Sequence, residues 1–343
     1  MRISEEGLGE APVLTGTMAA ACQLARAAAF SGVGLHSGSA CAVRVRASAP
    51  GSGIVFQIGG AHVRATVDAV ASTDYATTLV APNGRSVATV EHLLAALSAC
   101  CLDNVLVDVD GPEIPILDGS SREFVEAFER CGLMPSFPEN TPKSLRDYRR
   151  YIEVKRPIRV VSPDRKREAW LLPKSPFAAT AMEVTTHGTN VGRLALDWQH
   201  YDDVYGLTLS ADVDFSERGL PRSTVETSID QFAKDIAASR TFTFEQDIDQ
   251  LWRAGLAKGG SLDCALFFDD AGAPVNSGGL RFPDEWARHK LLDCIGDLAL
   301  AGRPLHAHYH GVRPGHSLNV ALVEELLSCE ENYTTVDVIT NHS

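Results

Sequence analysis

Residues 288–297 read Arg-His-Lys-Leu-Leu-Asp-Cys-Ile-Gly-Asp, a helical pattern with an unusual polar face. His289 and Asp293 are four residues apart, so on a helix they lie one turn apart on the same face. Glu285 and Asp297 extend this row by a turn in each direction, while the apolar residues between them could pack the helix onto a core. Imidazole and carboxylate groups are both zinc ligands, so the row suits a metal site. For this helix alone, a solvated polar face with a His–Asp pair is the simpler alternative.

The composition is that of a globular protein rather than a nucleic-acid-binding or membrane protein. The chain has 343 residues, which fits two domains, with 45% hydrophobic and 22% charged residues. A net charge of −13 argues against nucleic acid as a partner. No apolar run is long enough to span a bilayer, and the start lacks the basic residues of a signal peptide. The eight cysteines show no CxxC spacing, so we expect free thiols and a cytoplasmic location.

Hydrophobic periodicity predicts alternating helices and strands along most of the chain. Helices are expected at 87–97, 121–131, 228–238, 243–253 and 284–301, the first of them capped by Thr89. Strands are expected at 40–46, 53–58, 62–67, 103–109, 151–154, 207–213, 264–268 and 304–311. Each half therefore contains a helix with possible ligands followed by a strand.

This internal similarity predicts an α+β fold of two similar domains. Each domain is expected to be a small, mostly antiparallel sheet with helices layered on it, with the active site at the inter-domain interface. The predicted division of the chain is an N-terminal extension at 1–25, domain I at 26–140, a linker at 141–150, domain II at 151–327 with a possible insertion at 175–205, and a tail at 328–343.

Two different sets of histidines could complete a metal site. Zinc in a hydrolase commonly has three protein ligands and one open position, so His289 and Asp293 need a partner. His92 is a candidate because the neighbouring Glu91 could serve as a base. The rival is the alternating His-Ala-His-Tyr-His run at 306–310, in which His306, His308 and His310 would share one face of a strand and form a tripod. No obvious base lies near this rival set.

A further histidine, His316, follows a glycine on what we expect to be a loop. Such a position allows the side chain to reach into a cleft. As a cation it could stabilise an oxyanion or protonate a leaving amine, and Asp297 could keep it protonated. Lys290 and Arg313 could neutralise a phosphate.

Several motifs together resemble those of the UDP-3-O-acyl-N-acetylglucosamine deacetylases. The resemblance extends over residues 25 to 325 in the same order. The motifs are Gly-Val-Gly-Leu-His at 32–36, Thr-Val-Glu-His-Leu-Leu-Ala-Ala-Leu at 89–97, Pro-Glu-Ile-Pro-Ile-Leu-Asp-Gly-Ser at 112–120, Ser-Arg-Thr-Phe at 239–242, Gly-Gly-Ser-Leu-Asp-Cys-Ala at 259–265, the helix at 288–298 and Gly-His-Ser-Leu-Asn at 315–319.

The resemblance implies a zinc amidase of lipid A biosynthesis that removes acetate from UDP-3-O-(3-hydroxyacyl)-N-acetylglucosamine, with an apolar passage in domain II for the acyl chain. We expect a monomer whose partner is this small-molecule substrate; Fe²⁺ would fit the same ligands. The resemblance implies that zinc is bound by His92, His289 and Asp293, and that Glu91 is the general base. It implies that His316, oriented by Asp297, stabilises the oxyanion and protonates the leaving amine, and that Thr241 adds a hydrogen bond to the tetrahedral intermediate. The implied substrate-binding residues are Lys290, Phe242, Asp247 and His36.

Three positions depart from the pattern common in that family. Thr243 replaces a glycine, Arg313 replaces a lysine, and Pro314 replaces a serine. None is an implied ligand or base. Two alternatives stay open, namely a zinc amidase for another N-acetylated nucleotide sugar and a non-catalytic relative that binds a nucleotide sugar. A kinase is disfavoured because no phosphate-binding glycine loop followed by lysine is present.

Overall fold

The first half of the chain forms a five-stranded sheet with two helices on one face. The computed structural model describes residues 21–136, 149–174, 183–186, 189–193 and 206–337. Sheet order is β2 (Ala28–Val33), β3 (Ala40–Ala47), β9 (Val105–Asp110), β4 (Ile54–Ile58) and β5 (Ala61–Arg64). All neighbours pair antiparallel except β4 and β9. The helices are α1 (Glu91–Ala99) and α2 (Arg122–Cys131).

A larger mixed sheet forms the second half. It contains β11 (Arg150–Val154), β12 (Ile158–Val161), β13 (Glu168–Leu172), β16 (Leu207–Val213), β17 (Ser223–Ser228), β20 (Leu305–Val312) and β21 (Tyr333–Asp337). Strand β20 lies between β13, which is antiparallel to it, and β16, which is parallel. The long helices of this half are α5 (Glu285–Leu298) and α6 (His316–Leu327).

Smaller elements decorate these two units. Three are pairs of strands: β1 (Cys22–Leu24) with β10 (Leu133–Pro135), β14 (Glu183–Thr186) with β15 (Thr189–Arg193), and β18 (Phe242–Phe244) with β19 (Leu266–Phe268). A three-stranded sheet contains β6 (Val70–Ser72), β7 (Thr78–Val80) and β8 (Ser86–Val87). Two short helices are α3 (Phe232–Asp235) and α4 (Glu245–Arg253). None of the helices described is long and apolar enough to cross a membrane.

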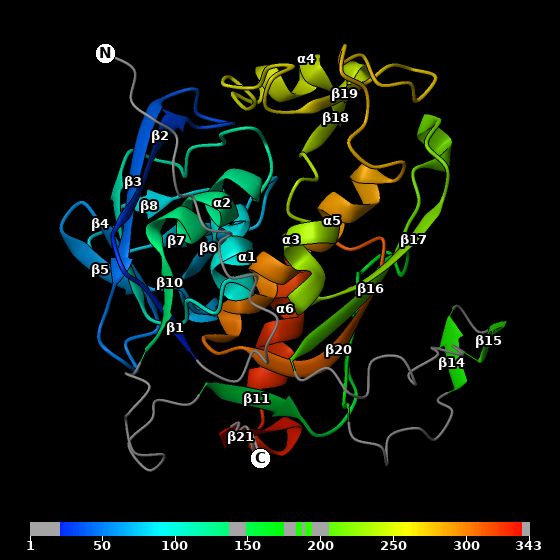
Figure 1. Cartoon of the computed structure of the whole chain (residues 1–343). Coiled ribbons are helices and arrows are strands. Elements are labelled where there is room, and N and C mark those ends of the chain that lie inside the picture. Colours follow the sequence, from blue (N-terminus) through cyan, green and yellow to red (C-terminus); the bar gives the residue numbers. More distant parts are fainter. Residues whose placement is uncertain (1–20, 137–148, 175–182, 187–188, 194–205, 338–343) are drawn as a thin grey trace, which may run out of the picture.

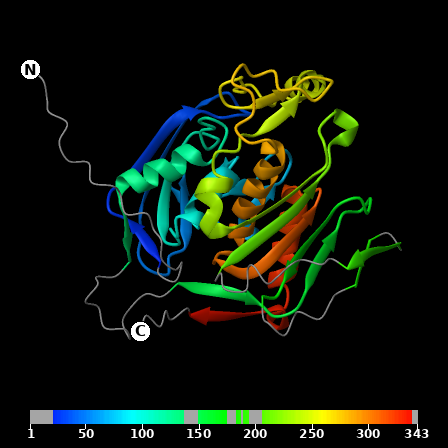
Figure 2. The ribbon, with the colours of Figure 1, turned by 45° about the vertical axis from the view of Figure 1, so that its right-hand side comes forward.

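Helices from both halves form the centre of the molecule. Figures 1 and 2 show α1 and α5 between the two main sheets, with α6 beside α5. The buried faces of the three helices carry Leu93, Leu97, Leu291, Ile295 and Leu322, all at most 1% exposed. Each Å² of apolar surface removed from water contributes about 25 cal/mol to stability. Burial on both sides therefore holds these helices in place. The predicted α+β class, with helices layered on small sheets, is confirmed.

The crossing of α1 and α5 depends on a glycine. A Cβ built on Gly296 would lie 2.0 Å from the backbone oxygen of Glu91. Only a residue without a side chain therefore lets the two backbones approach this closely. The contact occurs at the first residue of α1, so it also places Glu91 and His92 beside the polar row of α5.

We expect Gly296→Ala to lower the free energy of unfolding by about 2–3 kcal/mol, because backbone atoms cannot move aside as a flexible side chain would. Urea denaturation measures this change. Gly278→Ala is the matched control, since a Cβ there meets no atom within 4 Å. Equal stability of the two variants would contradict a close crossing.

Several predicted elements differ from the structure. Thr89 does not cap α1: its φ is +59° and its hydroxyl donates to Glu113. The helix expected at 228–238 is only the short α3, preceded by a 3₁₀ turn. His316 lies not on a loop but at the first position of α6, a helix that the sequence reasoning missed.

The predicted domain boundaries stay predictions. Residues 137–148, which contain most of the linker, and much of the 175–205 stretch lie outside the described residues. The predicted extension includes β1, which pairs with β10, and the predicted tail includes β21, which pairs with β11. Both ends of the described chain are thus joined to sheets.

Candidate active site

Two imidazoles and one carboxylate meet where α1 crosses α5. His92 is the second residue of α1, and His289 and Asp293 lie one turn apart on α5. The Nε2 atom of His92 lies 3.7 Å from Asp293 Oδ1, and the Nε2 atom of His289 lies 3.4 Å from the same oxygen. One potential ligand atom from each of the three residues lies within 4.8 Å of the other two. All three side chains are buried. Two imidazoles and a carboxylate at this spacing could hold a divalent metal ion.

His289 is held in the state that a metal ligand needs. Its Nδ1 lies 3.0 Å from the carbonyl oxygen of Ser239, so Nδ1–H donates to that carbonyl and the Nε2 lone pair is left free. Burial lowers the pKa of His289 to about 3, which keeps the ring neutral at physiological pH.

Asp293 is held as a carboxylate. Burial alone would raise its pKa, but the Lys290 ammonium, 2.5 Å from Oδ2, outweighs that effect and holds the pKa well below its usual range. The residues present therefore fit a bound cation. In the described part of the chain, no other cluster of three His, Cys, Asp or Glu side chains meets the same proximity.

The rival tripod on β20 does not form. His308 lies 2.9 Å from the Thr208 hydroxyl through Nδ1 and 3.0 Å from the Ser210 hydroxyl through Nε2. His310 Nδ1 lies 2.8 Å from the same Ser210 hydroxyl. The Nδ1 of His306 accepts the backbone N–H of Gly206 at 3.2 Å. The three rings thus make hydrogen bonds to β16 and to the residue before it, and they do not form a group of possible metal ligands.

Glu91 faces the cation site from the start of α1. Its side chain is buried, and Oε2 accepts the backbone N–H of Thr77 at 3.1 Å. Burial raises the pKa of the Glu91 carboxyl, and a carboxylate with a raised pKa accepts a proton more readily. The second oxygen lies 3.8 Å from Nε2 of His316. A buried carboxyl group and an imidazole thus lie side by side.

His316 is paired with a buried carboxylate. Its Nδ1–H donates to Asp297 Oδ2 at 2.9 Å. Burial alone would lower the pKa of this ring, but Asp297, with Glu91, outweighs burial and raises the pKa to about 9. The imidazolium is therefore the form present at neutral pH.

Two residues that the sequence reasoning did not assign complete this arrangement. The Thr77 hydroxyl donates to Asp297 Oδ1 at 2.6 Å, and Asn319 Nδ2 donates to Oδ2 at 2.9 Å. Asn319 stood in the quoted 315–319 motif, which could have indicated it. Thr77 carries no signal in the sequence, because its role comes from contacts with residues 14 and 220 positions away.

A cavity of about 230 Å³ opens onto these groups and receives side chains from both halves of the chain. Its lining comprises Leu35, His36, Tyr75, Thr89, Glu91, His92, Phe215, Thr241, Phe242, His289, Lys290, Asp293, Pro314 and His316. Phe242 sets its ring edge-on to His289, with centroids 6.3 Å apart. The cavity is thus polar at the metal group and aromatic on the side of β18.

The residues expected to bind substrate divide into two groups. His36, Phe242 and Lys290 line the cavity, as does Thr241. Asp247 does not; it lies on α4, where its carboxylate pairs with Arg218 at 2.5 Å. Arg313, expected to neutralise a phosphate, pairs instead with Asp214.

Comparison with known proteins shows the family of this chain. Residues 22–205 and 197–328 match the family model described as LpxC: UDP-3-O-acyl N-acetylglycosamine deacetylase. A UDP-3-O-acyl-N-acetylglucosamine deacetylase of Geobacter sp. (strain M21) is 37% identical over 319 residues, 92% of this chain and 91% of that protein. One of Brucella melitensis biotype 2 (strain ATCC 23457) is 34% identical over 320 residues, 92% and 97% of the two chains. The chain therefore belongs to the UDP-3-O-acyl N-acetylglycosamine deacetylase family.

Proposed function

We propose that this protein is a zinc-dependent deacetylase that hydrolyses the acetamide of UDP-3-O-(3-hydroxyacyl)-N-acetylglucosamine. The products are acetate and the free 2-amine, in an early step of lipid A biosynthesis. The observation that carries the proposal is the convergence of a His–His–Asp group, a buried glutamate and a histidine–carboxylate pair on one cavity. The family membership and the names of the relatives support the substrate.

His92, His289 and Asp293 would hold the metal ion. When bound, zinc would polarise the acetamide carbonyl and lower the pKa of water at its open position. Fe²⁺ would fit the same residues. The neutral His289 ring and the carboxylate of Asp293 are the protonation states that either cation requires.

The remaining residues move protons and stabilise charge. Glu91 accepts the proton of the attacking water, for which its raised pKa suits it. The His316 imidazolium then stabilises the negative oxygen of the tetrahedral intermediate and gives a proton to the leaving amine. Asp297 keeps that ring oriented and charged. The Thr241 hydroxyl adds a hydrogen bond to the same oxygen.

The rest of the substrate would extend from this centre along both walls of the cavity. We assign the nucleotide-sugar side to His36, Phe242 and Lys290. The apolar passage for the acyl chain, expected in the second domain, stays a prediction. The role of Asp247, the monomeric state and the cytoplasmic location stay predictions.

Metal removal tests the proposed function. Acetate release from UDP-3-O-acyl-N-acetylglucosamine should fall to background after treatment with a strong chelator, because the three proposed ligands hold a single metal ion and the proposed reaction depends on it. Stoichiometric zinc should restore it. A parallel assay with other N-acetylated nucleotide sugars separates the substrate alternatives. Tight binding of metal without acetate release from any of them would leave only a non-catalytic, nucleotide-sugar-binding role.

A further inference from the structure

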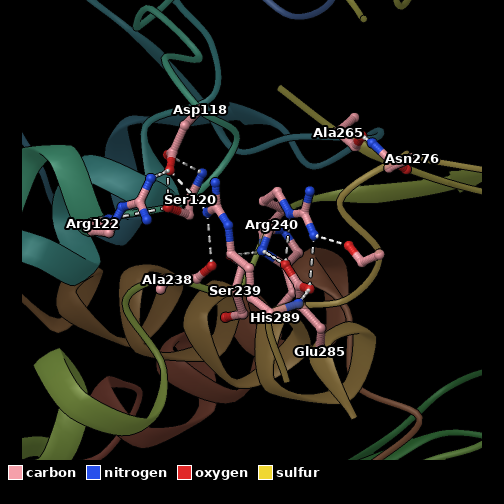
Figure 3. Close-up of polar contacts among 12 residues, drawn as sticks. Asp118, Ser120, Arg122, Ala238, Ser239, Arg240, Ala265, Asn276, Glu285 and His289 are labelled. Atoms are coloured by element: carbon pink, nitrogen blue, oxygen red, sulfur yellow. Dashed lines mark hydrogen bonds and ion pairs between the residues drawn. The ribbon is translucent and has the colours of Figure 1, made fainter. Parts of the chain in front are cut away.

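Glu285 is a fully buried carboxylate one turn before His289 on α5, and the mechanism above does not use it. Its side chain is 0% exposed. Oε1 accepts the backbone N–H of Arg240 at 3.0 Å and its Nε at 2.8 Å, while Oε2 accepts Nη2 at 3.1 Å and the backbone N–H of Arg281 at 2.6 Å. Figure 3 shows Arg240 directly above this carboxylate. Four donors satisfy the buried charge completely.

The contact that matters for the site is the one with the backbone. The N–H of Arg240 and the carbonyl of Ser239 belong to the same planar peptide unit, so their directions are fixed relative to each other. Glu285 accepts that N–H, and His289 donates Nδ1–H to that carbonyl. Two residues of one helix, four positions apart, therefore hold one peptide plane from opposite ends.

This peptide plane in turn determines what His289 presents to the cation site. A carbonyl aimed at Nδ1 requires the proton on that nitrogen and leaves Nε2 as the ligand. A structural ion pair would need only the side-chain contacts between Glu285 and Arg240. The additional bond to the main chain fixes the orientation of the peptide beside the metal group.

The next residue along the chain is fixed by the other half of the molecule. The N–H of Thr241 donates to the carbonyl of Gly119 at 2.8 Å. A Cβ on Gly119 would lie 1.8 Å from the backbone oxygen of Cys264, so this loop fits tightly against the segment before β19. Asp118 of the same loop pairs with Arg281 at 2.9 Å. The segment 239–241 is thus held from both sides.

We infer that Glu285 is a positioning residue for metal binding, acting through the Ser239–Arg240 peptide on the imidazole of His289. The inference rests on the proposed function, because it assumes that His289 is a metal ligand. It goes further by assigning part of the metal affinity to a residue that cannot reach the ion itself.

The test is the zinc affinity of Glu285→Gln, measured by competition with a chromophoric chelator. The amide oxygen can replace only one of the two carboxylate oxygens. The N–H₂ group then meets either the Arg240 N–H and Nε or the Arg240 Nη2 and the Arg281 N–H, so in both orientations it displaces Arg240 and with it the Ser239–Arg240 peptide. We expect the Kd for zinc to rise about 10- to 100-fold. The visible spectrum of the cobalt-substituted protein should also shift, because it reports ligand geometry. Glu285→Asp keeps the charge but shortens the reach, and serves if the first variant does not fold.

The matched control is Glu168→Gln on β13. Glu168 is also buried and accepts two donors from Arg159, at 3.0 and 2.6 Å, but it does not line the cavity. This control should lower Tm without changing zinc affinity. If the Glu285 variants lose Tm yet bind zinc within twofold of the wild type, Glu285 is structural only and the inference fails. If the wild-type protein itself binds no zinc, the proposed function is refuted. That measurement needs no variant, so the two failures can be told apart.

Discussion

Glu91→Gln should lower kcat for acetate release by about 10²- to 10⁴-fold, the range typical for loss of a general base. The amide has nearly the same shape as the carboxylate but cannot accept the proton of the attacking water. Its oxygen can still accept the N–H of Thr77, so the fold around the start of α1 should persist. The measurement is steady-state kinetics on the zinc-loaded protein.

Metal content and KM are the controls for this variant. Glu91 is not one of the three proposed ligands, so zinc stoichiometry should remain one per chain. KM should change little, because a base acts on the transition state rather than on substrate binding. Retention of more than a tenth of the wild-type kcat would show that another group removes the proton.

His316→Gln is expected to have the second largest effect, a loss of about 10²- to 10³-fold in kcat. The substitution removes both the positive charge near the oxyanion and the proton for the leaving amine. Zinc binding should persist, because the ring belongs to α6 and is separate from the metal group.

The pH profile distinguishes this role from a structural one. The pKa of His316 is raised to about 9, so the required cation is present at neutral pH and is lost as pH rises through that value. A bound metal cation nearby lowers the pKa of an imidazolium, so the alkaline limb of kcat is expected at or below pH 9. The residual activity of His316→Gln should lack that limb. An unchanged limb in this variant would assign it to a different group.

The row of possible metal ligands on α5 could be predicted from the sequence because its information is local. A spacing of four residues determines which side chains share a helical face, and the structure places His289 and Asp293 accordingly. The proximity of His92 to this row is different. His92 lies about 200 positions away, and no periodicity connects it to α5, so the resemblance to a known family was needed.

The errors have equally physical causes. Pro314 and Gly315 before His316 indicated a loop, but a glycine in extended conformation also precedes a helix well, and α6 begins directly after it. Thr89 looked like a helix cap. Its backbone instead takes a left-handed conformation that turns its hydroxyl toward Glu113, a partner 24 positions away. Such long-range contacts decide the outcome and leave no local pattern.

The positions of Glu91 and His316 at the first residues of α1 and α6 have opposite electrostatic consequences. The aligned peptide dipoles of a helix give its N-terminus a partial positive charge, worth about 0.3–1 kcal/mol to a nearby ion. This potential favours the anion of Glu91 but opposes the cation of His316. The positive ring therefore depends on Asp297, whose carboxylate accepts hydrogen bonds from Thr77 and Asn319. Two helix dipoles directed at one cavity thus help the base and work against the acid.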